Sequence, residues 1–493
     1  MKRYFLFVFI AFFGVLSTLD ARRNQPAEPQ GGFELTVRIH GYPEDEMLRL
    51  GRFFGTQTHL VDTAVFDAAR GVFVFRRDEP LQGGMYILVS HTNFPAEFIV
   101  DQYQHFSIEL RYPEFGVDMQ FTGSPENQIF SDFNAQIRPM HQEIGEIRRQ
   151  RSELEDRDSP EGMALNEQEQ AIWANVNQLQ RQFMEDNPEH LMTAVFRAQR
   201  DIEVPDAPDY IPEDEQNNWR YNYWKRNFFN NMDLTDSRLL RTGGVGSPTI
   251  FHQRLTRFLD VVLMPTPDSI ISGLDHMINQ MRGDSALFQY VIWYTTDRFM
   301  RSQIIGHDAI WVHLVDRYYL TGDAFWVSEA TLENFQRAAD RARPLLIGAV
   351  PSEFASPDLE GRWRSVFEAT RTNRYTVVVF WESRCGHCRR MMPILRDFYN
   401  ERREDLDFEI FAVYQRSGDT QQDWRDYLNT NNMTNWINVH GGSSTARWDQ
   451  DWDVTSVPTI FILDNQRRIV TRRINVEQIE PFIRNWNAMH FSN

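Results

Sequence analysis

Apolar and polar residues alternate along the first quarter of the chain, and this period-two pattern indicates short β-strands. Glycine, proline, asparagine and aspartate separate the alternating segments. Six segments share the pattern: residues 33–39, 59–66, 71–75, 85–89, 97–100 and 106–110. Several short strands at this spacing predict an antiparallel β-sandwich domain over residues 31–125. The domain holds no candidate catalytic cluster, so we expect a docking or spacer module.

A helical period replaces the alternation from residue 126 and predicts an all-α domain over residues 126–345. Up to residue 187 the helices are polar, with opposite charges three and four positions apart, which indicates solvent-exposed faces; a partner-binding hairpin is the alternative. A proline-rich acidic loop at 204–216 follows. Beyond it, aromatic residues from Trp224 to Phe299, Trp293 among them, recur at helical spacing and predict core packing in preference to a ligand groove.

Strands and helices alternate in the last part of the chain, which predicts an α/β domain over residues 346–493 with helices on both faces of the sheet. The expected strands are residues 375–381, 408–414, 436–439, 459–463 and 468–473. One expected helix follows Cys385, and two others occupy residues 420–431 and 476–489. A chain of 493 residues is too long for one core and suggests about three domains.

A basic start followed by a short apolar run predicts a secretory signal peptide over residues 1–21. The run is short for a membrane span, and an uncleaved anchor is the alternative. No cysteine lies near it, so a lipoprotein is not expected. The net charge of −18 argues against binding to nucleic acid or to an anionic lipid surface.

Both cysteines of the chain lie in the segment Cys385-Gly-His387-Cys388, between a predicted strand and a predicted helix. Free amide groups and the helix dipole at a helix N-terminus stabilise a thiolate, so Cys385 is the expected nucleophile. Cys388, one turn further, is expected to be more buried and to act as the resolving thiol. A protonated His387 favours the thiolate and makes the disulfide easier to reduce.

Two structural alternatives for the cysteines are weaker. A structural zinc site needs four ligands, and the sequence has no second cysteine pair. The histidines 307 and 313 are six positions apart, unlike the four-residue spacing of helical zinc ligands, so we expect no metal. A disulfide between cysteines three positions apart closes almost no loop and constrains little.

The segment from Phe380 to Cys388 resembles the active site of the thioredoxin superfamily, and Pro393 matches the proline inside its active-site helix. The segment around Val457-Pro458 resembles the second signature, a cis-proline whose preceding residue binds substrate backbone. The long interval between the two signatures is typical of the exported TlpA-like thiol–disulfide oxidoreductases, which are relatives of peroxiredoxins. The preceding β and helical regions resemble domains of unknown function found beside such domains. The resemblance assigns substrate binding to Trp381, Val457 and Pro458.

The chain departs from this family at the residues that relay protons. Val379 stands where cytosolic thioredoxins have a buried aspartate, and Met391 stands where many TlpA-like proteins have a glutamate. Glu382 is close in sequence, but a turn residue is expected to be solvated. Water, His387 or a group that the sequence does not identify must therefore take the proton of Cys388.

The resemblance implies an exported enzyme without a cofactor that reduces protein disulfides in the periplasm, with electrons from a membrane-bound thiol reductant. A disulfide oxidase or isomerase is the alternative within enzymes, because Cys-Gly-His-Cys also occurs in isomerases. From another class, a non-enzymatic binding or scaffold protein of the cell envelope is the alternative.

Overall fold

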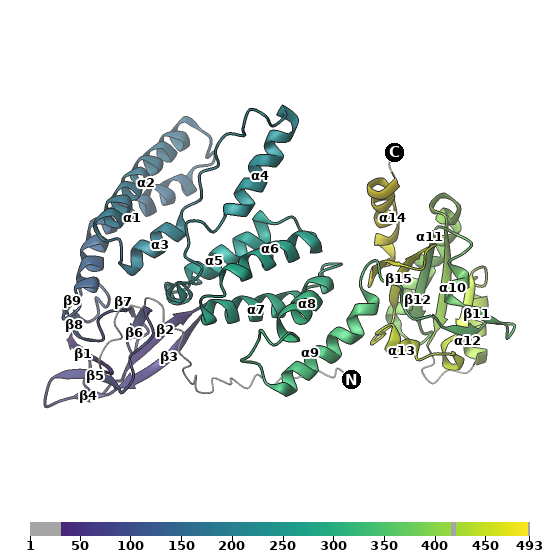
Figure 1. Cartoon of the computed structure of the whole chain (residues 1–493), viewed down its shortest axis with the longest axis horizontal. Helices are drawn as coiled ribbons and strands as arrows, with labels where there is room; N and C mark the ends of the chain where they lie inside the picture. Colours follow the sequence, from purple (N-terminus) through teal and green to yellow (C-terminus); the bar gives the residue numbers. More distant parts are fainter. Residues whose placement is uncertain (1–30, 416–420, 492–493) are drawn as a thin grey trace. The chain divides into compact units, whose positions relative to one another are not determined.

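The computed structural model describes residues 31–415 and 421–491 (Figure 1). The expected signal peptide, residues 1–21, lies outside the described residues. The chain forms two compact units. One holds the described residues up to Gln199 together with Arg238–His252, and the other holds Arg200–Ser237 together with Gln253 onwards. The helical region is thus shared between the two units, and the boundaries 126 and 345 stay a prediction.

The N-terminal region is rich in β-sheet, as expected. One sheet has the order β4-β5-β1-β8-β9 and the other β3-β2-β6-β7. The strands are β1 (Phe33–His40), β2 (Leu48–Phe54), β3 (Gln57–Ala64), β4 (Phe66–Asp67), β5 (Val72–Arg77), β6 (Gly84–Val89), β7 (Pro95–Val100), β8 (His105–Arg111) and β9 (Gln120–Thr122). The six expected segments all contain strands; the expected segment 59–66 is divided between β3 and β4, and β2 and β9 were not expected.

Alternate residues of both sheets point into one shared hydrophobic core. In β1, for example, Phe33, Leu35 and Val37 are completely buried, and they meet Leu48 and Leu50 of β2 in the same core. The expectation of a purely antiparallel arrangement is wrong at one pair, because β1 and β8 run parallel. The chain segment between them crosses both sheets, so their relative direction depends on long-range packing and not on a hairpin turn.

The first three helices belong to the same unit as these sheets: α1 (Pro125–Glu153), α2 (Pro160–Asp186) and α3 (Leu191–Gln199). The prediction of exposed, charge-paired helices is confirmed, because Arg149 pairs with Glu146 and Glu153 at 2.6 Å on the surface of α1. At its first turn α1 is tied to the sheet. The buried Asn127 side chain accepts a hydrogen bond from the Ile99 N–H and donates one to the Ile99 carbonyl, both at 2.7 Å.

The remaining helices of the middle region are α4 (Gln216–Asn227), α5 (Ile250–Arg257), α6 (Pro267–Gln280), α7 (Ser285–Met300), α8 (Asp308–Leu314) and α9 (Glu329–Ala342). Two π-helical segments, Phe258–Val262 and Val315–Tyr319, continue α5 and α8. Aromatic core packing is confirmed for Phe228, Phe229 and Phe258, which are buried and in ring contact. It is wrong for Trp293, which is 49% exposed, because the buried positions of α7 lie on the other side of the helix.

The C-terminal region forms a five-stranded mixed sheet with the order β14-β13-β12-β15-β16. Its strands are β12 (Tyr375–Trp381), β13 (Phe408–Tyr414), β14 (Ile437–His440), β15 (Thr459–Asp464) and β16 (Ile469–Arg472). β12, β13 and β14 are parallel, and β15 and β16 pair antiparallel. A small β-hairpin, β10 (Ala355–Pro357) and β11 (Trp363–Ser365), precedes them.

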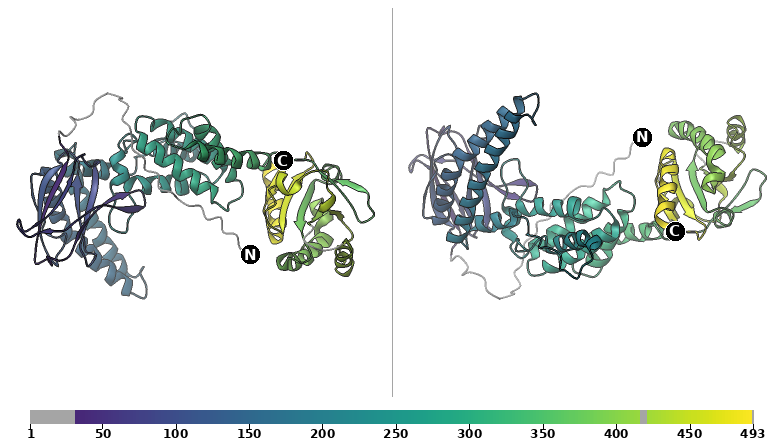
Figure 2. Two further views of the ribbon diagram at one scale, coloured as in Figure 1. Left: turned by 90° about the horizontal axis from the view of Figure 1, so that it is seen from below. Right: turned by 90° about the horizontal axis from the view of Figure 1, so that it is seen from above.

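Helices cover both faces of this sheet, as predicted. Residues of α11 (Gly386–Leu406), α12 (Gln421–Thr430) and α14 (Val476–Phe491) share one core with one face. Residues of α10 (Val366–Ala369) and α13 (Trp448–Asp451) share a second core with the other face. Figure 2 shows α14, in yellow, beside the sheet. Among the described residues, no helix is both long enough and apolar enough to cross a bilayer.

Candidate active site

Cys385 lies at the end of the turn that connects strand β12 to helix α11. Strand β12 ends at Trp381, and Cys385 is the N-cap of α11, with an extended backbone (φ −69°, ψ 117°). Its Sγ accepts a hydrogen bond from the Cys388 N–H at 3.3 Å, which satisfies one of the free amides of the first turn. The side chain is partly exposed. The free amide N–H groups and the positive end of the helix dipole would stabilise a thiolate at this position.

Cys388 lies one turn further and is completely buried, which confirms the expected difference in exposure between the two thiols. Burial raises the pKa of the Cys388 thiol to about 12, and the neighbouring Cys385 and the charge of Glu382 act in the same direction. The Glu382 backbone N–H donates to the Cys388 sulfur and opposes part of this effect. Cys388 therefore stays a neutral thiol at neutral pH.

The segment Val457-Pro458 lies next to Cys385. The Cys385 thiol donates to the Val457 carbonyl oxygen at an S···O distance of 3.5 Å, and the Val457–Pro458 peptide is cis, as the resemblance implies. β12 and β15 are adjacent antiparallel strands with Phe380 opposite Thr459. The end of β12 is therefore beside the start of β15, and the residues just beyond both ends meet. Val457 and Pro458 are partly exposed.

Trp381 is completely buried, so its indole has no surface open to a substrate in this structure. Its ring contacts those of Tyr414 and Tyr427, with centroids 5.2 and 5.3 Å away. His387 is exposed on the first turn of α11. The structure therefore brings Cys385, Cys388, Val457 and Pro458 together, while Trp381 lies beneath them in the core.

Sequence reasoning did not identify the side chain that holds the turn before Cys385. The Ser383 hydroxyl and the Tyr414 hydroxyl form a hydrogen bond of 2.9 Å, which connects this turn to the end of β13. It also did not identify Tyr427, which comes from α12. The only signal for these residues was indirect: Tyr414 ends a predicted strand next to β12, and strand ends at one edge of a parallel sheet lie close together.

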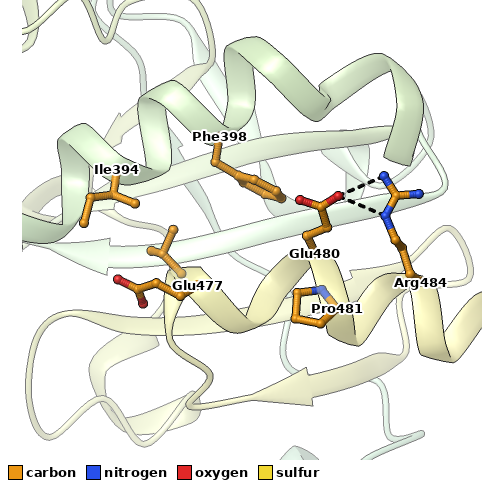
Figure 3. A pocket seen from close by; sticks show the side chains of 7 residues that line it. Ile394, Phe398, Glu477, Glu480, Pro481 and Arg484 are labelled. Atoms are coloured by element: carbon orange, nitrogen blue, oxygen red, sulfur yellow. Dashed lines mark hydrogen bonds and ion pairs between the residues drawn. The ribbon is translucent and has the colours of Figure 1, made fainter.

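A groove of about 400 Å³ lies elsewhere on the domain, between α11 and α14 (Figure 3). Its apolar floor carries charged residues at the edge, where Glu480 accepts a hydrogen bond from Arg484 at 2.9 Å. The groove is lined by Ile394, Phe398, Val476, Glu477, Glu480, Pro481 and Arg484, none of which is a predicted site residue. Within the described part of the chain, no three His, Cys, Asp or Glu side chains gather as metal ligands would.

Comparison with known proteins agrees with this geometry. A family model described as thioredoxin-like matches residues 373–469, which contain both cysteines. Residues 373–469 are a thioredoxin-like domain. A second model, for a domain of unknown function, matches residues 166–343. The matched residues include the complete strand–turn–helix segment that holds the cysteine pair.

Two curated relatives match parts of the chain. Sporulation thiol-disulfide oxidoreductase A of Bacillus subtilis is 25% identical over 126 residues, which are 26% of this chain and 73% of the relative. A thioredoxin-like protein of Haemophilus influenzae is 30% identical over 107 residues, which are 22% of this chain and 58%, less than two thirds, of the relative. Among solved structures, a thioredoxin-like protein from Bacteroides caccae aligns with 58% of this chain and 99% of its own, at 15% identity and a TM-score of 0.41.

Proposed function

We propose that this chain is an exported thiol–disulfide oxidoreductase that reduces protein disulfides through Cys385 and Cys388. The observation that carries the proposal is the contrast between the two thiols. Cys385 is partly exposed at a helix N-cap and adjoins the backbone of Val457, whereas Cys388 is completely buried behind it. One sulfur can meet a substrate, and the other can react only with a disulfide formed on the first. The thioredoxin-like domain and the named oxidoreductase relative support the same reaction class.

The reaction has two exchange steps. The Cys385 thiolate attacks one sulfur of the substrate disulfide, so that a mixed disulfide forms and the other substrate sulfur leaves as a thiolate. Cys388 then attacks the Cys385 sulfur, closes the Cys385–Cys388 disulfide and releases the second substrate sulfur. The substrate gains two electrons and takes up two protons, and the enzyme's dithiol becomes a disulfide. A further thiol reductant must return the pair to the reduced state.

The site residues contribute different properties to these steps. The Val457 backbone beside Pro458 aligns an extended substrate segment next to Cys385. Trp381, buried beneath the site, positions the turn through its packing and does not contact substrate. His387, exposed next to the cysteines, adds positive charge when protonated and makes the disulfide easier to reduce.

The direction of electron flow is proposed as reduction in the periplasm, with a membrane-bound thiol reductant as the electron source. The reduction potential separates the two directions: a value near about −270 mV supports a reductant, and one near about −120 mV supports an oxidant. The N-terminal sheets, proposed as a two-layer sandwich, and the helical domain would serve to dock this domain to partners. Their proposed limits are residues 31–125 and 126–345, with the redox domain at 346–493.

The activity is tested by reduction of a protein disulfide with the full chain and with the Cys385→Ser variant. The wild type should turn over and the variant should not, whereas equal rates would remove the proposed activity. A Cys388→Ser variant should accumulate mixed disulfides that mass spectrometry identifies. The matched control is the Cys385→Ser/Cys388→Ser double variant, which carries no thiol and should capture nothing. Capture by the double variant would show a non-covalent binding protein instead.

A further inference from the structure

The groove between α11 and α14 begins at the edge of the sheet that carries the cysteine pair. Strands β12 and β16 both pair antiparallel with β15, so they run in the same direction and end at the same edge. Helix α11 follows β12 after a short turn, and α14 follows β16. The turn before α14 is tied to the start of β15, because the Arg473 N–H donates a hydrogen bond of 2.7 Å to the Ile460 carbonyl, two residues after Pro458. Both helices therefore begin at the edge that carries Cys385 and Pro458.

One face of α11 connects Cys385 to the groove. The residues of this face follow one another at four-residue spacing and are neighbours along the helix surface: Gly386, Arg390, Ile394 and Phe398. Ile394 and Phe398 point towards α14 and form the apolar side of the groove (Figure 3). Ile394 is 45% exposed, although its side chain is apolar. It lies nine positions after Cys385, which corresponds to about 13 Å along the helix axis at about 1.5 Å per residue.

Arg390 places a positive charge between Cys385 and the groove. Its guanidinium extends back towards the nucleophile, because Nη1 lies 3.9 Å from the position that a Cβ on Gly386 would occupy. Arg390 is exposed, and within the described part of the chain no carboxylate forms an ion pair with it. The segment 383–396 contains four arginines and one histidine but no acidic residue, although the chain has a net charge of −18. The charge next to Cys385 therefore favours an acidic partner.

A protein substrate attached to Cys385 would cover this surface. A typical interface covers about 800 Å² of each partner and so extends roughly 16 Å from its centre, a distance that includes the groove. An extended polypeptide advances about 3.3 Å per residue, so the groove lies about four residues from the attacked cysteine and Arg390 about two. The edge formed by α14 is charged, with Glu477, Glu480 and Arg484, which makes insertion into a lipid bilayer costly. A polypeptide segment is therefore the occupant that fits the groove.

We propose that the groove binds an apolar side chain of the protein substrate, about four residues from the cysteine that Cys385 attacks, and that Arg390 binds an acidic side chain between the two. This inference rests on the proposed function and names the class of substrate for it. The two exchange steps are unchanged. Burial of the apolar side chain against Ile394 and Phe398 and the ion pair with Arg390 make attack by Cys385 faster for substrates of this class.

The test uses three short peptides with blocked termini, each joined to a second copy through its one cysteine. The first carries aspartate two positions and leucine four positions from the cysteine on both sides, so the direction of the chain does not matter. The second has lysine in place of aspartate, and the third has serine in place of leucine. Quenched-flow chromatography measures the rate constant of each with the reduced full chain. Rates with dithiothreitol correct for the intrinsic reactivity of each disulfide.

The wild type should prefer the first peptide in both comparisons. We expect a preference for aspartate over lysine of about fivefold, the range of exposed charge pairs. We expect a preference for leucine over serine of about fivefold as well, because apolar surface becomes buried. Arg390→Glu should remove only the first preference and Ile394→Ser only the second, whereas Ile394→Leu should keep both. Ratios between peptides on the same variant cancel any change in the reactivity of Cys385 itself.

Two matched controls carry the same kinds of change elsewhere on the domain. Arg371→Glu reverses a charge at an exposed position after α10, a helix that covers the other face of the sheet. Val350→Ser removes an apolar side chain that is 50% exposed. It lies beside the opposite end of β16, where the Ile469 N–H donates to the Ala349 carbonyl at 2.8 Å. Both variants should keep the two wild-type preferences, and loss of a preference in its matched control would overturn the proposal.

The outcomes separate this inference from the proposed function. If the reduced wild type does not react with 2,2′-dipyridyl disulfide, a small uncharged disulfide, the proposed function is contradicted. If it reacts but the three peptides give equal corrected rates, only the present inference is overturned. Preferences that persist in both Arg390→Glu and Ile394→Ser would overturn it too. A dimer in sedimentation velocity that Ile394→Ser dissociates would assign the groove to a second copy of the chain, and that result also overturns the inference.

Discussion

The Cys385 thiol lies 3.5 Å from the carbonyl oxygen of Val457, although the two residues are 72 positions apart in the chain. The contact follows from the pairing of β12 with β15, in which Phe380 is opposite Thr459. A slip of one residue in this register would turn every side chain of the strand to the opposite face of the sheet. The position of the nucleophile beside the Val457 backbone therefore depends on the same register that buries the core.

The burial of Cys388 gives a prediction for its reactivity. In the Cys385→Ser variant, Cys388 is the only thiol of the chain. Because the thiolate is the reacting form and burial, the largest cause of the raised pKa of Cys388, remains in this variant, alkylation by iodoacetamide should still increase with pH above about pH 8.5, where an ordinary cysteine levels off. Mass spectrometry measures the rate. The denatured variant, as a control, should level off near about pH 8.5, and a similar plateau in the native variant would contradict the prediction.

The hydrogen bond between Ser383 and Tyr414 gives a prediction for stability. A double-mutant cycle with Ser383→Ala and Tyr414→Phe should give an interaction energy of about 1 kcal/mol, because each substitution removes one partner of this bond. Urea unfolding of the full chain provides the free energies. The transition that shifts on oxidation of the cysteine pair identifies the C-terminal domain. Strictly additive single effects would show that the two hydroxyls are not coupled.

Glu126 gives a prediction for the pH dependence of the N-terminal unit. Burial raises the pKa of this carboxyl to about 8, the charge of Asp101 adds to the effect, and backbone N–H groups at 101–103 oppose it. The folded state therefore binds the proton more tightly than the unfolded state. The stability that this provides is complete below about pH 4.5 and is lost as the pH rises towards about 8.

The Glu126→Gln variant should remove this pH dependence. Its melting temperature should equal that of the wild type near about pH 5 and exceed it near about pH 8, since a neutral amide replaces a carboxyl that is costly to ionise. Scanning calorimetry between these values measures the difference. The exposed Glu161→Gln variant on α2 is the control and should follow the wild type. Parallel curves for Glu126→Gln and the wild type would refute the prediction.

Asn127 provides a prediction about the connection of α1 to the sheet. Asn127→Asp cannot donate to the Ile99 carbonyl and places a charge at a completely buried position. We expect a loss of about 3 kcal/mol or more in the free energy of unfolding, measured with urea. The control Gln136→Glu adds the same charge at an exposed position of α1 and should have little effect. Equal midpoints for the two variants would show that Asn127 does not hold the helix to the sheet.

Strand β2 shows why part of the fold could not be predicted from the sequence. The strand pairing is irregular between Leu50 and Gly51, so the buried side of the strand changes there, and a period-two pattern cannot be followed through it. Gly51 allows the close packing, because a Cβ at this position would lie 3.0 Å from the Ile87 side chain. The parallel pairing of β1 with β8 was also not predictable, because alternation indicates that a strand exists but not which strand lies beside it.

Some residues of the candidate site could likewise be predicted from the sequence, and others could not. A strand, a turn and a helix carry Cys385 and Cys388 within a short segment, and a second local pattern carries Val457 and Pro458, so their chemistry could be predicted. Ser383, Tyr414 and Tyr427 contribute through contacts between separate elements, which no local pattern contains. The burial of Trp381 likewise depends on rings supplied by β13 and α12.

By itself, the amino-acid sequence determined the order of strands and helices and the pair of thiols at a helix start, because periodicity and helix-end electrostatics act over a few neighbouring residues. Only the tertiary structure decided how completely Cys388 is shielded and which side chains of distant segments hold the turn before Cys385. These properties depend on strand register and on packing between distant segments, through which burial makes the Cys388 thiolate costly and leaves Cys385 open to solvent.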